Sequence, residues 1–330
     1  MLSLFSFLLF CGLPIYTYAI PESIDLQHKP NESSLETLQN QVDKLLYEFT
    51  PKSYAEVEHI LNPLITSTNT DIRLWATDTL ANMHFVGQTA LAQKDKIAGF
   101  KEAEKLYKSL AAQDVDSKIK SQAIFTLATM NSQGQTELAR QNKIEAFKEA
   151  ERLLRILMSD DKNEMKDFVS ILLATYHRQE QTGLSHFDRQ ASLKEAEQIF
   201  NKILQKKSKN PHKFWCMEQL ALMHKNGLTE RSQKDKIAGF KEAEKLFNTL
   251  AEQNEEISFK SGALFQLINM NRDGQTEISR QNKTKAYKEV ERLLKIIINT
   301  KNIPENNKKD ALELLEKMKK QGVIQGDKTK

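Results

Sequence analysis

Apolar and polar positions follow a pattern that returns along the chain about every 47 residues. The segment QKDKIAGFKEAEKL occupies 93–106 and recurs letter for letter at 233–246. Looser copies share its spacing, and the part common to all five copies begins at an Asp or Asn. A fixed period of this length is typical of stacked helical repeats, so we predict one array of similar repeats rather than two unrelated domains. The five starting residues are Asp95, Asn142, Asp188, Asp235 and Asn282.

Each repeat contains two helical patterns. The first follows A-x-x-x-L-A, as at Ala76, Leu80 and Ala81, and four of the five repeats have a glycine seven residues after the leucine. Glycine tolerates the left-handed backbone that ends many helices, whereas the third repeat has Glu180 at this position. The second helix is expected to begin at the Asp or Asn, which are common N-cap residues. We therefore predict a helix, a loop of about eight residues and a second helix in each repeat.

The second helix carries small residues four and eight positions after its cap. Residues four apart share a helix face, so a strip without bulk allows another backbone to approach closely. We expect tight packing along this strip in every repeat. The pairs are Gly99 and Ala103, Ala146 and Ala150, Ser192 and Ala196, Gly239 and Ala243, and Ala286 and Val290.

The two ends of the chain depart from the repeat. Residues 1–20 are apolar and uncharged, and Thr17 and Ala19 are the small residues expected before a signal-peptide cleavage site after Ala19. We therefore predict a secreted, periplasmic or lumenal protein, with an uncleaved membrane anchor as the alternative. The predicted organisation is a signal peptide (1–20), a polar spacer (21–33), a degenerate N-terminal capping hairpin (34–67), five helical hairpins (68–300) and a C-terminal capping helix with a tail (301–330).

The charge balance and the cysteine positions limit which partners and which chemistry the sequence predicts. The chain has 48 Lys and Arg against 44 Asp and Glu, a small excess that is spread along its length. This balance predicts no nucleic-acid surface and no membrane contact beyond the leader. Of the two cysteines, Cys11 lies in the leader. Cys216 falls in the same column as Ala76, which indicates a small core residue rather than a nucleophile.

Paired glutamates two residues apart occur in all five repeats, as at Glu102 and Glu104. An active site is normally single, and glutamates two apart on a helix point to different faces. A surface or packing role is therefore the better prediction for these pairs than a role as paired catalytic acids. We expect no catalytic residue in them.

A second polar column lies near the end of each first helix. One interpretation is a hydrogen bond close to the helix terminus, and the other is a polar ladder lining a partner-binding groove. A shared metal is implausible, because ligands lie about 2 Å from one ion whereas equivalent positions in successive repeats are on the order of 10 Å apart. We expect no metal and no cofactor. The column consists of His84, Asn131, His177, His224 and Asn271, which are the candidate partner-binding residues.

The helix pattern, the glycine, the Asp or Asn cap and the small pair, in this order over residues 54–300, resemble the Sel-one-like subclass of tetratricopeptide repeats. Helical pairs of the HEAT type are the alternative on period alone. The resemblance implies a right-handed α-solenoid of antiparallel helix pairs whose concave face holds a protein or peptide partner, without catalysis. We therefore expect an exported interaction scaffold. The alternative is a catalytic or non-catalytic subunit of a secreted enzyme complex, for which Glu180 and the His186 region break the repeat pattern.

Overall fold

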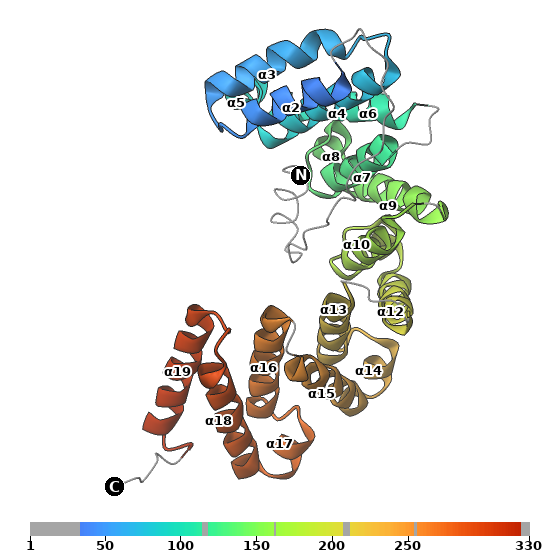
Figure 1. Cartoon of the computed structure of the whole chain (residues 1–330). Coiled ribbons are helices and arrows are strands. Elements are labelled where there is room, and N and C mark those ends of the chain that lie inside the picture. The colour runs from blue at the N-terminus through green and yellow to red at the C-terminus, as the bar shows by residue number, and fades with distance from the viewer. Residues whose placement is uncertain (1–33, 114–117, 162, 207–211, 254–255, 325–330) are drawn as a thin grey trace. The chain divides into compact units, whose positions relative to one another are not determined.

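The computed structural model describes residues 34–113, 118–161, 163–206, 212–253 and 256–324, and within these ranges it is all-helical with no strand (Figure 1). The predicted signal peptide and polar spacer lie outside the described residues. None of the helices in the described ranges is both long and apolar enough to cross a membrane. Before the repeats come α2 (Leu35–Leu46) and α3 (Pro51–Leu64), and after them comes α19 (Glu305–Lys320).

Each repeat contains a long helix, a five-residue helix and a second long helix. The chain divides into two compact units, residues 1–189 and 190–330, which we describe separately as the N-terminal and C-terminal units. The repeats are α4 (Thr70–Val86), α5 (Ala90–Lys94) and α6 (Lys96–Ala111); α7 (Lys118–Ser132), α8 (Glu137–Gln141) and α9 (Lys143–Ser159); α10 (Lys166–Arg178), α11 (Gly183–Phe187) and α12 (Arg189–Gln205); α13 (Lys213–Lys225), α14 (Glu230–Lys234) and α15 (Lys236–Glu252); and α16 (Ile257–Arg272), α17 (Glu277–Gln281) and α18 (Lys283–Asn299).

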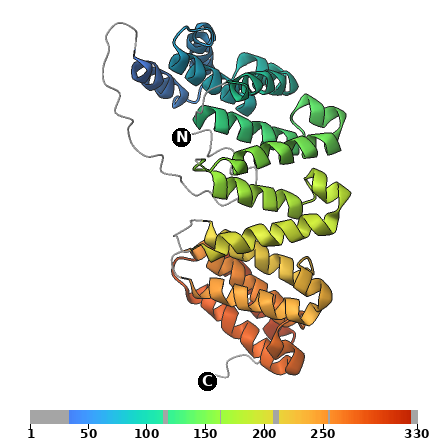
Figure 2. The ribbon, with the colours of Figure 1, turned by 90° about the vertical axis from the view of Figure 1, so that its right-hand side faces the viewer.

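Packing follows chain order within each unit. In the N-terminal unit α3 packs on α4, α4 on α6, α6 on α7, α7 on α9 and α9 on α10, which Figure 2 shows as the succession from blue to yellow-green. In the C-terminal unit α13 packs on α15, α15 on α16, α16 on α18 and α18 on α19. Each helix therefore buries its apolar stripe against helices close to it in the chain.

The core is built from the columns that recur in the sequence. Ala76, Ala123, Val169, Cys216 and Ala263 are all fully buried. This confirms that Cys216 is a core residue. The next apolar column is also fully buried, with alanine in four repeats and isoleucine in the fifth: Ala81, Ala128, Ala174, Ala221 and Ile268.

The small strip on the second helix does allow a close approach, and its neighbour is the five-residue helix of the same repeat. A Cβ atom added to Gly99 would lie 2.5 Å from Ala92 Cβ and 3.1 Å from the carbonyl oxygen of His84. At Gly239 the corresponding distance to Ser232 Cβ would be 2.4 Å. Because Gly99 and Gly239 have no side chain, the short helix can pack directly against the second long helix.

The predicted helix ends are confirmed where the structure gives their geometry. The four glycines that follow the first helices have φ between 74° and 84°, and Glu180 adopts the same left-handed region with φ 61°. At Gly87 the next residue, Gln88, donates its N–H to Met83 O at 2.8 Å, which is the bond expected of a Schellman cap. Asp95, Asn142, Asp235 and Asn282 accept backbone N–H bonds as N-caps.

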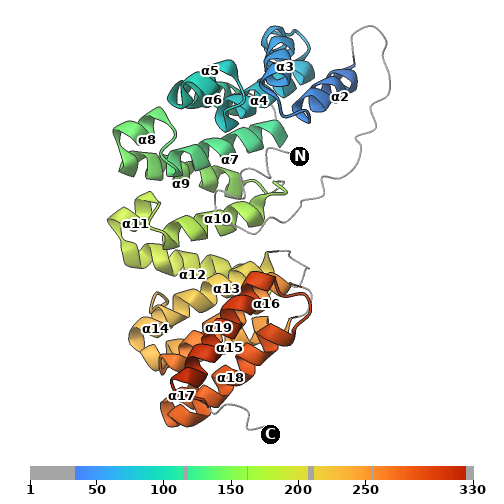
Figure 3. The ribbon, with the colours of Figure 1, turned by 90° about the vertical axis from the view of Figure 1, so that its left-hand side faces the viewer.

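The predicted eight-residue loop is wrong in one respect, because it contains a helix (Figure 3). In each repeat a threonine two residues after the left-handed residue accepts a bond from the backbone N–H three residues on, as Thr89 does from Ala92 at 3.2 Å. This bond caps a single turn of helix. Asp95 then ends α5 and begins α6. The capping threonines are Thr89, Thr136, Thr182, Thr229 and Thr276.

Candidate functional site

The candidate partner-binding column lies inside each repeat. All five side chains are at least 94% buried, and each is bonded to the capping threonine of its own repeat at 2.8 or 2.9 Å. The hydrogen-bonding interpretation therefore agrees with where these side chains lie. Because they are buried, little of their surface is left for a partner to contact. The bonded pairs are His84 and Thr89, Asn131 and Thr136, His177 and Thr182, His224 and Thr229, and Asn271 and Thr276.

Histidine and asparagine can replace each other in this column because both offer an acceptor at the same place. In the two asparagine repeats the threonine hydroxyl donates to the asparagine Oδ1. Burial, the main cause, lowers the pKa of His84 and His224, which favours the neutral ring. A neutral ring can accept the same hydroxyl bond at Nδ1.

In four of the five glutamate pairs, the second glutamate has a role that depends on the following repeat. Glu104 Oε2 accepts the backbone N–H of Glu137, the first residue of α8, at 2.8 Å. An equivalent bond links each repeat to the next one along the chain. Glu58 in α3 accepts the corresponding bond from the first repeat. The carboxylates therefore satisfy orphan N–H groups at helix N-termini. The bonds run from Ala90 to Glu58, from Glu137 to Glu104, from Leu184 to Glu151, from Glu230 to Glu197 and from Glu277 to Glu244.

The two residues that break the repeat pattern are held by different neighbours. Glu180 accepts a bond from Arg189 Nε at 2.6 Å. The His186 ring stacks on Phe147, with 5.5 Å between ring centroids and 13° between planes. Each therefore has a structural contact in the N-terminal unit. Within the described ranges, no group of three or more His, Cys, Asp or Glu side chains could hold a metal ion.

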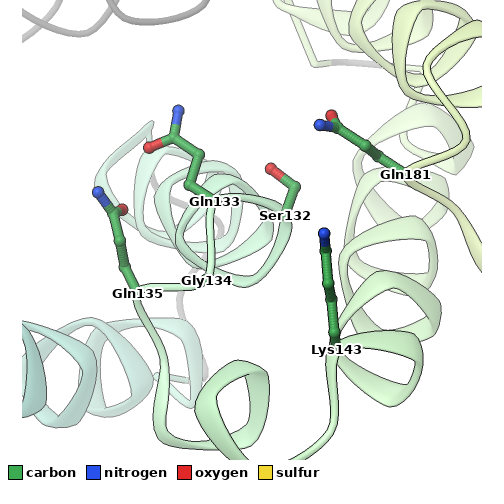
Figure 4. A pocket seen from close by; sticks show the side chains of 6 residues that line it. All are labelled: Ser132, Gln133, Gly134, Gln135, Lys143 and Gln181. Carbon is green, nitrogen blue, oxygen red and sulfur yellow. The ribbon is translucent and has the colours of Figure 1, made fainter.

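A cavity of about 560 Å³ lies in the N-terminal unit between the second and third repeats (Figure 4). Four consecutive residues at the end of α7 form one side of it. Lys143, the first residue of α9, lines another side, and Gln181 reaches it from the third repeat. Ser132, Lys143 and Gln181 face one another in Figure 4. The lining residues are Ser132, Gln133, Gly134, Gln135, Lys143 and Gln181.

The lining offers hydrogen-bond donors, acceptors and one cation. Ser132 Oγ donates to Thr129 O at 2.9 Å, which leaves its lone pairs as acceptors. Gln135 Oε1 is buried and has no hydrogen-bond partner among the described residues. Lys143 Nζ lies 5.3 Å from the centre of the Phe147 ring, within the range of a cation–π contact. These groups can bind a polar ligand but contain no nucleophile with an adjacent base.

Sequence reasoning singled out Gly134 as a helix-ending glycine but not the glutamines that line the cavity, although a signal was present. A glutamine directly precedes the capping threonine in four of the five repeats, at Gln88, Gln135, Gln181 and Gln275. Gln135 and Gln181 are therefore equivalent positions of adjacent repeats.

No family model, curated protein or solved structure matches the chain. Only the chemistry of its own residues therefore bears on its function.

Proposed function

We propose that this chain is a non-catalytic interaction scaffold that binds a peptide segment of a partner protein across adjacent repeats. The observation that carries the proposal is the cavity between the second and third repeats, because Gln135 and Gln181 line it from equivalent positions. An extended peptide presents backbone N–H and C=O groups, and a glutamine side chain can both donate to and accept from such groups. A ligand of this kind would contact successive repeats in the same way.

The architecture that we propose for this role is a right-handed α-solenoid of antiparallel helix pairs, of the Sel-one-like type. Two observations support it. The helices pack in chain order within each unit. The Glu-to-backbone bond recurs between repeats at a separation of 32 or 33 residues. In such an array each repeat is stabilised by its neighbours, and a row of equivalent side chains forms the binding surface.

The proposed partner is a protein rather than a nucleic acid. Lysines near the cavity are interspersed with carboxylates, as in the pair between Lys148 and Glu145 at 2.7 Å. A nucleic-acid surface would require a one-sided basic stripe. Because the leader is apolar, we also propose that the chain acts after export, with cleavage after Ala19.

The test is a peptide selection with the purified chain, followed by calorimetry on the selected peptides. We expect the double substitution of Gln135 and Gln181 by alanine to weaken binding by about ten-fold, as the loss of one or two hydrogen bonds predicts. The matched control is Gln88→Ala, which removes the equivalent glutamine from the first repeat, outside the cavity. Equal affinity of the double variant and the control would exclude this cavity as the peptide site.

A further inference from the structure

We infer that the cavity recognises an acidic side chain of the bound segment, with Lys143 binding its carboxylate and Gln135 accepting a backbone N–H. The inference rests on the proposed function and names the chemistry of the ligand.

Lys143 differs from the other lysines near the cavity, because it forms no ion pair with a described residue. In the part of the chain that the structure describes, no Asp or Glu lies within ion-pair distance of its Nζ, which rests over the Phe147 ring. The equivalent cation of the third repeat is Arg189, and Glu180 binds it at 2.6 Å. An exposed ammonium held in place by an aromatic ring is a ready partner for a carboxylate.

The backbone of Gln135 is fixed by two hydrogen bonds, one at its N–H and one at its carbonyl oxygen. Its N–H donates to Met130 O at 2.8 Å, and its carbonyl accepts from Arg140 Nη1 at 2.7 Å. The side-chain Oε1 is buried without a partner, and an unmet buried acceptor is unfavourable. Because solvent does not reach this atom, a ligand N–H can satisfy it only after the Gln135 side chain turns toward the cavity.

The remaining lining groups favour a carboxylate with a nearby N–H over a free dianion such as phosphate. Ser132 already donates to Thr129, so it can only accept from a ligand. A phosphate would therefore meet two acceptor oxygens, those of Ser132 and Gln135, and a single cation. Gln181 reaches the cavity from the next repeat and can donate to a carboxylate or a peptide carbonyl (Figure 4).

The volume favours a side chain within a passing segment over an isolated chain end. A cavity of about 560 Å³ is far larger than one carboxylate, and it lies between two repeats. A segment that continues from one repeat to the next can place an Asp or Glu at Lys143 while its backbone meets the glutamines.

The test uses three synthetic peptide libraries and the full chain, with binding measured by fluorescence anisotropy. The first library fixes one Glu among random uncharged residues and has amidated C-termini. The second has Gln in place of that Glu. The third has no acidic side chain and carries free C-terminal carboxylates. We expect the first to bind about ten-fold more tightly than the second, as one charge-assisted bond predicts.

Two variants connect this preference to the cavity. Lys143→Met keeps an aliphatic side chain over Phe147 and should abolish the preference for Glu over Gln, while Lys143→Arg should preserve it. The control is Lys96→Met, since Lys96 rests over Phe100 at 5.5 Å in the first repeat and lies outside the cavity. This control should keep the full preference.

The outcomes separate this inference from the proposed function. If the Gln library binds as tightly as the Glu library, and the double substitution of Gln135 and Gln181 still weakens both, the acidic inference is overturned and the scaffold proposal stands. If the third library alone binds in a Lys143-dependent way, the side-chain assignment is overturned. If no library binds, both proposals fail.

Discussion

The carboxylate of Glu104 accepts a hydrogen bond at 2.8 Å from the backbone N–H of Glu137, 33 residues later in the chain. Glu104 is almost completely buried, and its other oxygen binds Lys108 at 2.7 Å. One side chain thus ties the second long helix of a repeat to the short helix of the next. Because the bond recurs between the other repeats, it is a periodic link between neighbours.

Loss of this link should lower the stability of the N-terminal unit. We expect Glu104→Ala to reduce the free energy of unfolding by about 1–2 kcal/mol, because a partly buried N–H at a helix N-terminus loses its partner. Urea denaturation followed by circular dichroism measures the change. Glu102→Ala is the control on the same helix, since its pair with Lys105 is exposed and should contribute less than about 0.5 kcal/mol. Equal effects of the two substitutions would contradict this role.

Glu180 stands in the left-handed backbone region that the other repeats give to glycine. Its φ of 61° costs a residue with a Cβ atom about 1–2 kcal/mol. Glu180→Gly removes this cost but also the exposed pair with Arg189, so we expect a net gain of about 0.5 kcal/mol in the free energy of unfolding.

The reverse change supplies the control for the backbone effect. Gly87 has φ 84° and no atom within 4 Å of the place where a Cβ would lie. Gly87→Ala should therefore lose about 1 kcal/mol through backbone strain alone. Denaturation curves of both variants measure these changes, and a stabilised Gly87→Ala protein would refute the explanation.

Asp78 in α4 should make the protein less stable as the pH rises. Burial raises its pKa from 3.8 to about 6. Between these values the folded chain binds more protons than the unfolded chain, so stability falls with rising pH until the folded form has lost its proton. Since the side chain still reaches solvent in part, we expect a loss of about 2 kcal/mol from pH 4 to pH 7. Asp78→Asn should remove this component, and an unchanged pH profile of denaturation would count against it.

His224 should have the opposite effect at acidic pH. Its pKa is lowered from 6.5, mainly by burial, so its contribution to stability is complete above pH 6.5 and is lost as the pH falls below that value. His224→Asn should keep the bond to Thr229, because Asn131 and Asn271 make the same bond to their threonines. We expect similar stability at pH 7.5 and a smaller loss at pH 5. His224→Leu is the control, and it should be less stable at both pH values because Thr229 loses its partner.

Features set by residues close together in the chain could be predicted from the sequence. The caps at Asp95 and its equivalents and the left-handed turn at Gly87 each depend on bonds within a few residues. The 47-residue period is visible directly in the recurring segments. The buried position of Cys216 followed from its column, because equivalent positions of a repeat have similar surroundings. The short helix was missed because a single turn has too few residues to show a period.

Packing between repeats decided the features on which the proposed binding rests. The sequence contained Glu104 and Gln135, but it could not show that one would reach the backbone of the next repeat or that the other would line a cavity with Gln181. It also left two interpretations open for His84 and its equivalents, which the structure places beside the capping threonines. These outcomes depend on how far and at what angle one helix lies from the next, and side chains from both helices set that geometry together.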